Sequence, residues 1–476
     1  MASKASALDV LRTDRKLSFR EQLSLVVRLS IPAILAEITA IAMQYIDAGM
    51  VGSLGTNASA AIGLVSSTTW LMGGFCASVA AGFSVQVAHL VGAGREDRAR
   101  CVMRQGLIFG VAFGLVMALV GSLVAPHLPV WLGGEEVIHP WASSYFLVFA
   151  LAQPFTLCRI LGSGYLQCSG DMRTPSLFNA LACLWDVFFN YLLIFPTRTV
   201  TFLGWSIHMP GAGLGVTGAA LGTAFAEVVT ALCMLAVVFF RSPKLKLSLG
   251  GSWRLERSCL ATAARISVPM ALERGVISSA YVACTRIVTP LGTAAVAANS
   301  LAVTAESLCY MPGYGISAAA TSLVGQSLGA KRIDLARGFA RLTVLLAMVI
   351  MGCTGVLMYL FAPQVFSLLT PVAEVQLLGV ECLRIELFAE PLFAASIVAA
   401  GALRGAGDTL VPSAMNLISM WGVRVTLSLF LAPKFGLQGV WFAMCVELCF
   451  RGVLFLIRLF REKWLKCDLM EGDEPQ

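Results

Sequence analysis

The chain has 476 residues, of which 58% are hydrophobic and 13% charged, and its formal net charge is +7. A mean hydropathy of +0.80 excludes an ordinary soluble protein, whose surface needs far more polar groups than this composition supplies. Many apolar stretches reach the roughly 20 residues that cross about 30 Å of hydrocarbon. The sequence therefore predicts an all-α polytopic membrane protein. The positive charge is explained more simply by membrane topology than by nucleic acid, so no nucleic-acid partner is expected.

Apolar windows of about 19 residues predict twelve transmembrane helices in two lobes. A cytosolic segment, residues 1–26, precedes the first lobe, residues 27–240, and a cytosolic linker, residues 241–263, follows it. The second lobe covers residues 264–460, and residues 461–476 form a cytosolic tail. The first six helices are expected to begin near Val27, Ala60, Leu107, Ser144, Leu177 and Gly215. The second six are expected to begin near Ala264, Ala297, Leu342, Leu378, Val411 and Gly436.

Lysine and arginine alternate between the predicted connections. The stretches "GAGREDRAR" (92–100) and "GAKRIDLAR" (329–337) are strongly basic, whereas "APHLPVWLGGEEVIHP" (125–140) has neither residue. Because basic loops stay in the cytoplasm, this pattern predicts a multi-pass plasma (inner) membrane protein with both termini cytoplasmic. The two charged stretches are then cytosolic turns rather than phosphate-binding loops.

The two charged stretches also reveal an internal repeat, because they agree at six of nine positions when Gly92 is aligned with Gly329. The distance along the chain from Gly92 to Gly329 defines the repeat offset. The repeat offset also relates Pro32 to Pro269, and it recurs at several other separated places. Six helices per copy is an even number, so both copies enter the membrane from the same side. The sequence predicts two parallel six-helix repeats, with a cavity between them, as in many secondary transporters.

Motifs for nucleotides, metals and catalysis are missing from the sequence. "GLGVTG" (213–218) matches a dinucleotide fingerprint, but we expect a turn rather than a strand before it, and no acid follows about 20 residues later. The cysteines form no CxxC pair, and all four histidines fall at helix ends or in loops. We therefore expect no nucleotide, no cofactor other than a coupling ion, and no enzymatic activity.

Charged side chains within predicted helices cost about 3 kcal/mol each on insertion scales, so each one needs a reason. Glu447 and Arg451 stand four residues apart and are predicted to pair. Asp47 has no cation three or four residues away, and Asp186 shares a helical face with Asn190. Two carboxylates and an amide suit either Na⁺ or a shared proton. The alternative is that Asp186 and Asn190 only bond neighbouring helices together.

Several motifs resemble those of multidrug and toxic compound extrusion (MATE) transporters. These are "YIDAGMVGSLG" (45–55), "GVTGAALGTA" (215–224), "MPGYGISAAATSLVGQSLGAKRIDLAR" (311–337) and "GALRGAGDT" (401–409). The resemblance covers nearly the whole chain and is strongest to the prokaryotic branch similar to DinF proteins. It implies a V-shaped protein of twelve helices that exports organic cations in exchange for H⁺ or Na⁺.

The resemblance assigns a coupling site for H⁺ or Na⁺ to the first lobe. Asp47 matches the acid of the first helix, and Thr223 matches a polar residue of the sixth. The fifth-helix pair runs Asn then Asp in that branch, whereas here Asp186 comes first and Asn190 second. The reversal keeps the ligand types and leaves their individual roles open. Asp47, Asp186 and Asn190 are the residues that a bound Na⁺ would use.

A second acidic site of some family branches is not expected, because its positions are Ile277 and Phe393 in this chain. Four other residues are assigned to the substrate cavity: Glu273, Glu306, Tyr310 and Glu390. The partners implied are small organic cations and the lipid bilayer, and the protein is expected to be a monomer.

Two rival functions stay open from the sequence. One is a flippase for a lipid-linked intermediate, since Arg274, Arg286 and Arg424 would suit an anionic headgroup. The other is a membrane-embedded enzyme, which the absence of a His or Cys constellation near the acids disfavours.

Overall fold

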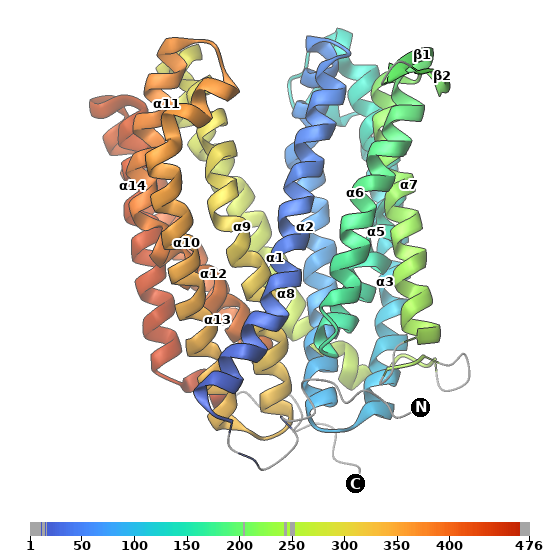
Figure 1. The fold of residues 1–476 in the computed structure, drawn as a ribbon, viewed down its shortest axis with the longest axis vertical. Coiled ribbons are helices and arrows are strands. Elements are labelled where there is room, and N and C mark those ends of the chain that lie inside the picture. The colour runs from blue at the N-terminus through green and yellow to red at the C-terminus, as the bar shows by residue number, and fades with distance from the viewer. Residues whose placement is uncertain are drawn as a thin grey trace. The chain divides into compact units, whose positions relative to one another are not determined.

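The computed structural model describes residues 17–202, 205–241, 245–247 and 253–466, together with Leu11 and Arg15, and it is almost entirely helical (Figure 1). Parts of the predicted N-terminal segment, linker and tail lie outside the described residues. The first half contains α1 (Phe19–Gly52), α2 (Thr56–Gly92), α3 (Glu96–Val124), α4 (Leu128–Trp131), η2 (Glu136–Ile138), α5 (His139–Cys168), α6 (Arg173–Ile194), β1 (Pro196–Phe202), β2 (Trp205–Ala212), α7 (Gly215–Ala236) and η3 (Val237–Arg241).

The second half repeats this order of long helices. It contains α8 (Arg257–Val288), η4 (Thr289–Leu291), α9 (Thr293–Gly329), α10 (Ile333–Leu369), α11 (Ala373–Glu386), η5 (Leu387–Ala389), α12 (Glu390–Gly405), α13 (Leu410–Leu417), η6 (Ile418–Val425), α14 (Thr426–Phe460) and η7 (Lys463–Lys466).

Within the described ranges, nine helical segments are long and apolar enough to cross a membrane. One of these, Leu410–Phe460, has 51 residues and is divided by a non-helical residue, Gly436, so it supplies two spans. Outside these nine, α8 and α9 have 32 and 37 residues, which is also enough to span. The described chain thus provides the twelve membrane-length helices that the sequence predicts, with α11 and α12 forming one broken span, Ala373–Gly405.

The backbone of the turns follows the same repeat as the sequence. Gly55 and Gly292 have φ values of 110° and 105°, and Gly170 and Gly407 have values of 89° and 83°. Gly94, with φ at 75°, is matched by Lys331, with φ at 59°. The members of each pair are separated by the repeat offset. Positive φ is rare outside glycine, so three matched pairs confirm two copies of one fold, not merely of one composition.

The ends of α2 and α9 cross through a reciprocal contact. A Cβ on Gly92 would overlap the backbone of Gln326, and a Cβ on Gly329 would overlap the backbone of His89. The two glycines are separated by the repeat offset, and so are the two backbone partners. Equivalent helix ends of the two repeats therefore contact each other through equivalent residues, which is the pattern of a self-complementary contact.

The chain folds into two compact units. Unit 1 comprises residues 1–38, 88–95 and 264–476, and unit 2 comprises residues 39–87 and 96–263. In unit 1, α9, α10, α12 and α14 pack around a core rich in alanine. In unit 2, α3 packs on α5 along a stripe of small residues, where a Cβ on Gly106, Gly110 or Gly114 would meet a residue of α5. Glycine at every fourth position lets the two backbones approach closely.

Between α6 and α7 the chain forms an antiparallel hairpin of β1 and β2, which the sequence analysis did not predict (Figure 1). The expectation of a turn before "GLGVTG" is therefore wrong, since β2 ends at Ala212 and α7 begins at Gly215. An isolated antiparallel pair still lacks the parallel βαβ unit of a dinucleotide site. Here a Cβ on Gly218 would overlap the backbone of Leu193, so that glycine permits close packing of α7 on α6.

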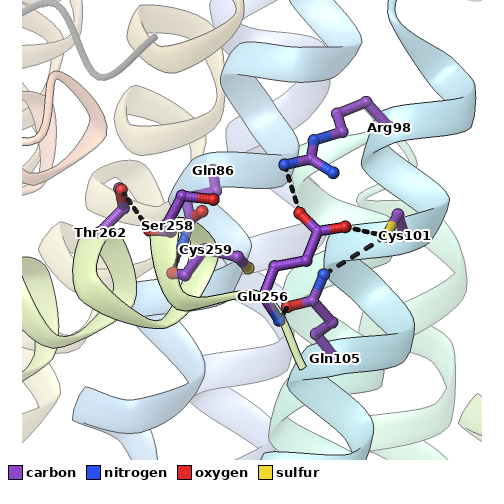
Figure 2. A network of polar contacts seen from close by, with 8 residues as sticks. All are labelled: Gln86, Arg98, Cys101, Gln105, Glu256, Ser258, Cys259 and Thr262. Atoms are coloured by element: carbon purple, nitrogen blue, oxygen red, sulfur yellow. Dashed lines mark hydrogen bonds and ion pairs between the residues drawn. The ribbon is translucent and has the colours of Figure 1, made fainter. Parts of the chain in front are cut away.

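The start of α8 is fastened to α3 within unit 2 (Figure 2). Glu256 forms an ion pair with Arg98 at 2.6 Å, and its backbone N–H donates to the side chain of Gln105 at 2.8 Å. The Sγ of Cys101 lies 3.6 Å from the second carboxylate oxygen of Glu256. One turn later, Gln86 of α2 donates to the carbonyl of Cys259 at 3.3 Å. These contacts fix where α8 begins.

Candidate functional site

The coupling residues that the sequence predicts come together in unit 2. The side-chain amide of Asn190 donates to Asp47 at 2.9 Å and to Asp186 at 3.0 Å. Asp186 and Asn190 lie one turn apart on α6, which is why one amide reaches both α6 and α1. Asp186 is fully buried and Asn190 is 1% exposed, while Asp47 is half-buried. The carboxyl of Asp47, which solvent partly reaches, therefore lies beside the carboxyl of Asp186, which solvent does not reach.

Residues of α7 pack against this site, and a tyrosine of α5 lies near its two carboxyls. A Cβ on Gly222 would overlap the side-chain oxygen of Asn190, so glycine is needed there for α7 to approach α6. Thr223, the next residue, donates its hydroxyl to the carbonyl of Ala219 at 3.2 Å and lies close enough to Asp186 to interact with it. Tyr145 is close enough to interact electrostatically with both Asp47 and Asp186. Four helices of unit 2 thus converge on the two carboxyls.

Two oxygen atoms of the site have hydrogen-bonding capacity to spare. Among the described residues, none donates a hydrogen bond to Oδ1 of Asp186 or to Oδ1 of Asn190, and both atoms are buried. Together with Asp47, they form a set of oxygen donors of the kind that hard cations prefer. The same two carboxyls are also suited to share a single proton, because two like charges so close together repel.

Three of the four predicted cavity residues lie near one another in unit 1. Glu306 and Tyr310 are one turn apart on α9, and Glu390, at the start of α12, interacts electrostatically with Glu306. The ring of Tyr310 packs edge-on against Phe393, with the centroids 5.6 Å apart. Glu306 is 3% exposed and Glu390 is fully buried. In this conformation neither carboxyl faces solvent.

The fourth predicted cavity residue, Glu273 of α8, belongs to a separate network. One oxygen accepts from Arg404 at 3.0 Å and from Asn416 at 2.7 Å, and the other accepts from Ser413 at 2.8 Å. With 6% exposure and three donors, Glu273 joins α8 to α12 and α13. These contacts favour a structural role over ligand binding.

A half-buried ion pair of unit 2 joins α5 to α7, and the sequence did not predict it. Arg159 of α5 binds Glu227 of α7 at 2.6 Å and also donates to Asn179 of α6 at 3.3 Å. The signal was present, since Arg159 stands alone in the apolar stretch "FTLCRILGS" (155–163), and an intramembrane cation demands an anion. By contrast, the predicted pair of Glu447 and Arg451 is confirmed at 3.2 Å.

Comparisons with known proteins agree with these features. The sequence profile of the MatE family matches residues 32–192 and 269–430, one match in each half of the chain. The chain is 25% identical over 448 residues to the probable multidrug resistance protein NorM of Thermotoga maritima, covering 92% of both chains. It is 24% identical over 418 residues to the probable multidrug resistance protein YoeA of Bacillus subtilis, covering 86% of this chain and 88% of the relative.

Solved structures share the fold. A structure described as the outward-facing conformation of a multidrug resistance MATE family transporter of the MOP superfamily superimposes with a TM-score of 0.88 and 21% identity. That match covers 98% of this chain and all of the other. A MOP superfamily transporter from Pyrococcus furiosus gives 0.86, again with 21% identity over 98% of this chain and all of the other. The chain therefore belongs to the MatE family, whose members are membrane transporters and not enzymes.

Proposed function

We propose that this protein is a secondary active antiporter that exports amphipathic organic cations in exchange for H⁺ or Na⁺. The observation that carries the proposal is the amide of Asn190, which donates to the carboxyls of Asp47 and Asp186 at 2.9 and 3.0 Å. The names of the NorM and YoeA relatives, which refer to multidrug resistance, support drug-like compounds as the substrates. The flippase alternative finds no support among these relatives and is not proposed.

Coupling follows from the crowding of negative charge. Two ionised carboxylates held by one amide repel each other, and a proton or Na⁺ relieves that repulsion. The proton belongs to the pair, so its binding is a property of both residues together. An organic cation that neutralises the same charge competes with the ion. Exchange requires such unfavourable coupling between its two ligands, and by linkage each one weakens the binding of the other.

The individual residues then have distinct duties. Asp47, the half-buried acid, exchanges the ion with the substrate pathway, whereas Asp186 is the buried partner that makes a second charge unfavourable. Asn190 holds the two carboxyls together, and Thr223 supports Asp186. Tyr145 interacts electrostatically with both acids, and aromatic rings attract organic cations.

We also propose a plasma-membrane location, cytoplasmic termini and a monomeric state. The basic turns at Arg95 and Arg332 and the stretch of residues 125–140 without Lys or Arg support this orientation. A cysteine placed at Glu135, in a background depleted of cysteine, should react with an impermeant reagent added to intact cells. Reaction only in inverted vesicles would reverse the assignment.

Transport itself is tested with inverted membrane vesicles and a fluorescent organic cation. An imposed pH gradient and an imposed Na⁺ gradient are applied in turn, and each is compared with a collapsed gradient. One of the two should drive accumulation of the dye, and its identity names the coupling ion. Equal accumulation with and without either gradient would contradict antiport.

A further inference from the structure

Two glutamates of unit 1 flank a break in a membrane helix. Glu386 ends α11, Glu390 begins α12, and the one-turn 3₁₀ segment η5 (Leu387–Ala389) separates them. Both residues are fully buried. No described residue donates a hydrogen bond to any of their four carboxylate oxygens. In this respect they differ from Glu273, whose two oxygens accept three hydrogen bonds.

The surroundings of this pair contain both acids and cations. Glu386 interacts electrostatically with Glu306, Glu390 and Arg424, and Glu390 interacts with Glu306. Gly355 of α10 closes the other side, since a Cβ there would lie 3.3 Å from Cβ of Glu390. The remaining titratable side chains that face the pair are uncharged at neutral pH: Cys309, Tyr310, Cys445 and Cys449.

The two nearby arginines are already engaged. Arg451 pairs with Glu447 at 3.2 Å, and its guanidinium lies 5.2 Å from the ring centroid of Phe393. Arg424 donates to Met444 at 2.7 Å, packs 5.4 Å from the ring centroid of Tyr281, and interacts with Glu306. Glu447 and Glu306 therefore balance the two cations. Arg424 also interacts with Glu386, but two arginines cannot neutralise four acids, so Glu386 and Glu390 have no cation of their own.

A buried carboxylate with no hydrogen-bond donor and no cation of its own is strongly unfavourable, whereas the neutral acid loses far less on burial. We propose that Glu386 and Glu390 form a second proton-binding site of this chain, separate from the site at Asp47 and Asp186. Each carboxylate takes up one proton from water on one oxygen and leaves the other oxygen as an acceptor.

The site has a consequence for transport, and only this consequence rests on the proposed antiport. Protons held beside a helix break are released when a change of conformation admits water or brings a cation to them. An exporter with this second site would move more protons per cycle than Asp47 and Asp186 alone supply. The protonation itself is a property of the folded chain and does not depend on any substrate.

Infrared spectroscopy of the purified protein in lipid nanodiscs at neutral pH tests the protonation directly, because neutral acids and carboxylates absorb at different frequencies. Glu386→Gln and Glu390→Gln should each remove the intensity of one neutral carboxylic acid, and the double variant should remove two. The matched control is Glu381→Gln on the same helix. Glu381 is exposed and accepts a hydrogen bond from Gln438 at 2.6 Å, so its loss should remove a carboxylate band.

Carboxyl-labelled glutamate in the wild-type protein provides a second measurement that needs no variant. The label should shift a neutral acid band, and this separates Glu386 and Glu390 from any proton shared by Asp47 and Asp186. Loss of carboxylate bands in both variants, or no label-sensitive acid band in the wild type, would overturn the proposal. Failure of dye export would contradict the proposed function and leave this spectrum unchanged.

Discussion

In the first half of the chain, Asp47 and Asp186 meet on the amide of one asparagine, whereas in the second half Glu273 accepts three hydrogen bonds from Arg404, Ser413 and Asn416. At the repeat offset, the positions of Asp47, Asp186 and Asn190 are occupied by Cys284, Val423 and Leu427. The two halves thus share the conformation of their turns and the contacts at their helix ends, but the second half has no acid at the positions of Asp47 and Asp186. A carboxylate with a cation and two further donors is saturated, so it holds helices together. Carboxyls that share one amide keep capacity for a ligand.

The largest effect is expected at Asp47. Asp47→Asn removes the charge but keeps the shape, so the protein should fold normally and lose gradient-driven dye export by at least about tenfold, which corresponds to roughly 1.4 kcal/mol. Asp186→Asn should be milder, because Asn190 and Thr223 still complete the site. The matched control is Asp97→Asn, since the side chain of Asp97 is 98% exposed and pairs with Arg100 on the surface. Export by Asp47→Asn at the wild-type rate would place coupling elsewhere, with Glu306 or Glu390 as the next candidates.

In the second half of the chain, substitution of Glu273 should lower the stability of the protein rather than uncouple transport. Glu273→Ala leaves Arg404, Ser413 and Asn416 without their acceptor, and loss of one partner of a buried ion pair costs about 3 kcal/mol. A lower thermal unfolding temperature and less protein in the membrane are expected. Glu273→Gln, which keeps an acceptor oxygen, should lose less. A Glu273→Ala protein of unchanged stability that no longer exports dye would show that Glu273 lines the cavity, as the sequence suggested.

Much of the fold could be predicted because hydropathy and repetition act locally. The predicted start at Gly215 agrees with α7, and Ala264 falls within α8, which begins seven residues earlier at Arg257. The ends of membrane helices, such as residues 19–26 of α1, mix charged and polar residues with apolar ones, so they do not form a continuous apolar stretch and were missed. A different signal in the sequence marks the start of α1. Ser18 and Glu21 form a capping box, in which each backbone N–H donates to the other residue's side chain, at 2.8 and 3.3 Å.

The choice of partners could not be read from the sequence. Asp186 and Asn190 were placed on one face by their spacing, but only the fold shows that the amide also reaches Asp47, 143 residues away. The same holds for Arg159 and Glu227, which are 68 residues apart. Several acids could have paired with each cation, and helix packing alone decides among them. The hairpin of β1 and β2 was missed because short strands between membrane helices have no strong periodicity.

The two halves also begin differently, and this gives a smaller effect that depends on pH. The repeat offset places Glu256 opposite Phe19, so the start of α8 is held to another helix, α3, by an ion pair, whereas the start of α1 has a capping box and a local ion pair between Arg15 and Glu21. Hydrogen bonding from Arg98 lowers the pKa of Glu256 below its ordinary value of 4.5, although partial burial opposes this. Because the pKa of Glu256 is lower in the folded state, its ion pair with Arg98 contributes its full stability above about pH 4.5. This contribution is lost as the pH falls through the pKa of the folded state.

The test compares Glu256→Gln with the wild type by thermal unfolding at a series of pH values. The variant should unfold at a lower temperature at neutral pH, and the gap should close as the pH falls below about 4.5. Glu135→Gln, in an exposed loop, is the control and should follow the wild type throughout. A gap that stays constant down to the lowest pH would mean that the carboxylate charge of Glu256 contributes nothing.

The smallest effect concerns the paired turns at Gly94 and Lys331. Both positions are exposed and have positive φ, at 75° and 59°, and nothing lies within 4 Å of a Cβ on Gly94. A side chain in this region costs about 1–2 kcal/mol, while glycine costs about 0.5–1 kcal/mol in lost backbone freedom. Gly94→Ala should therefore destabilise the protein slightly, and Lys331→Gly should stabilise it by about 0.5 kcal/mol. Thermal unfolding of the purified proteins measures both shifts, and dye export should stay within about twofold of the wild type, since neither turn is expected to bind a ligand. A large loss of export by Lys331→Gly at normal protein levels would show that the charge of Lys331, and not only the turn, takes part in transport.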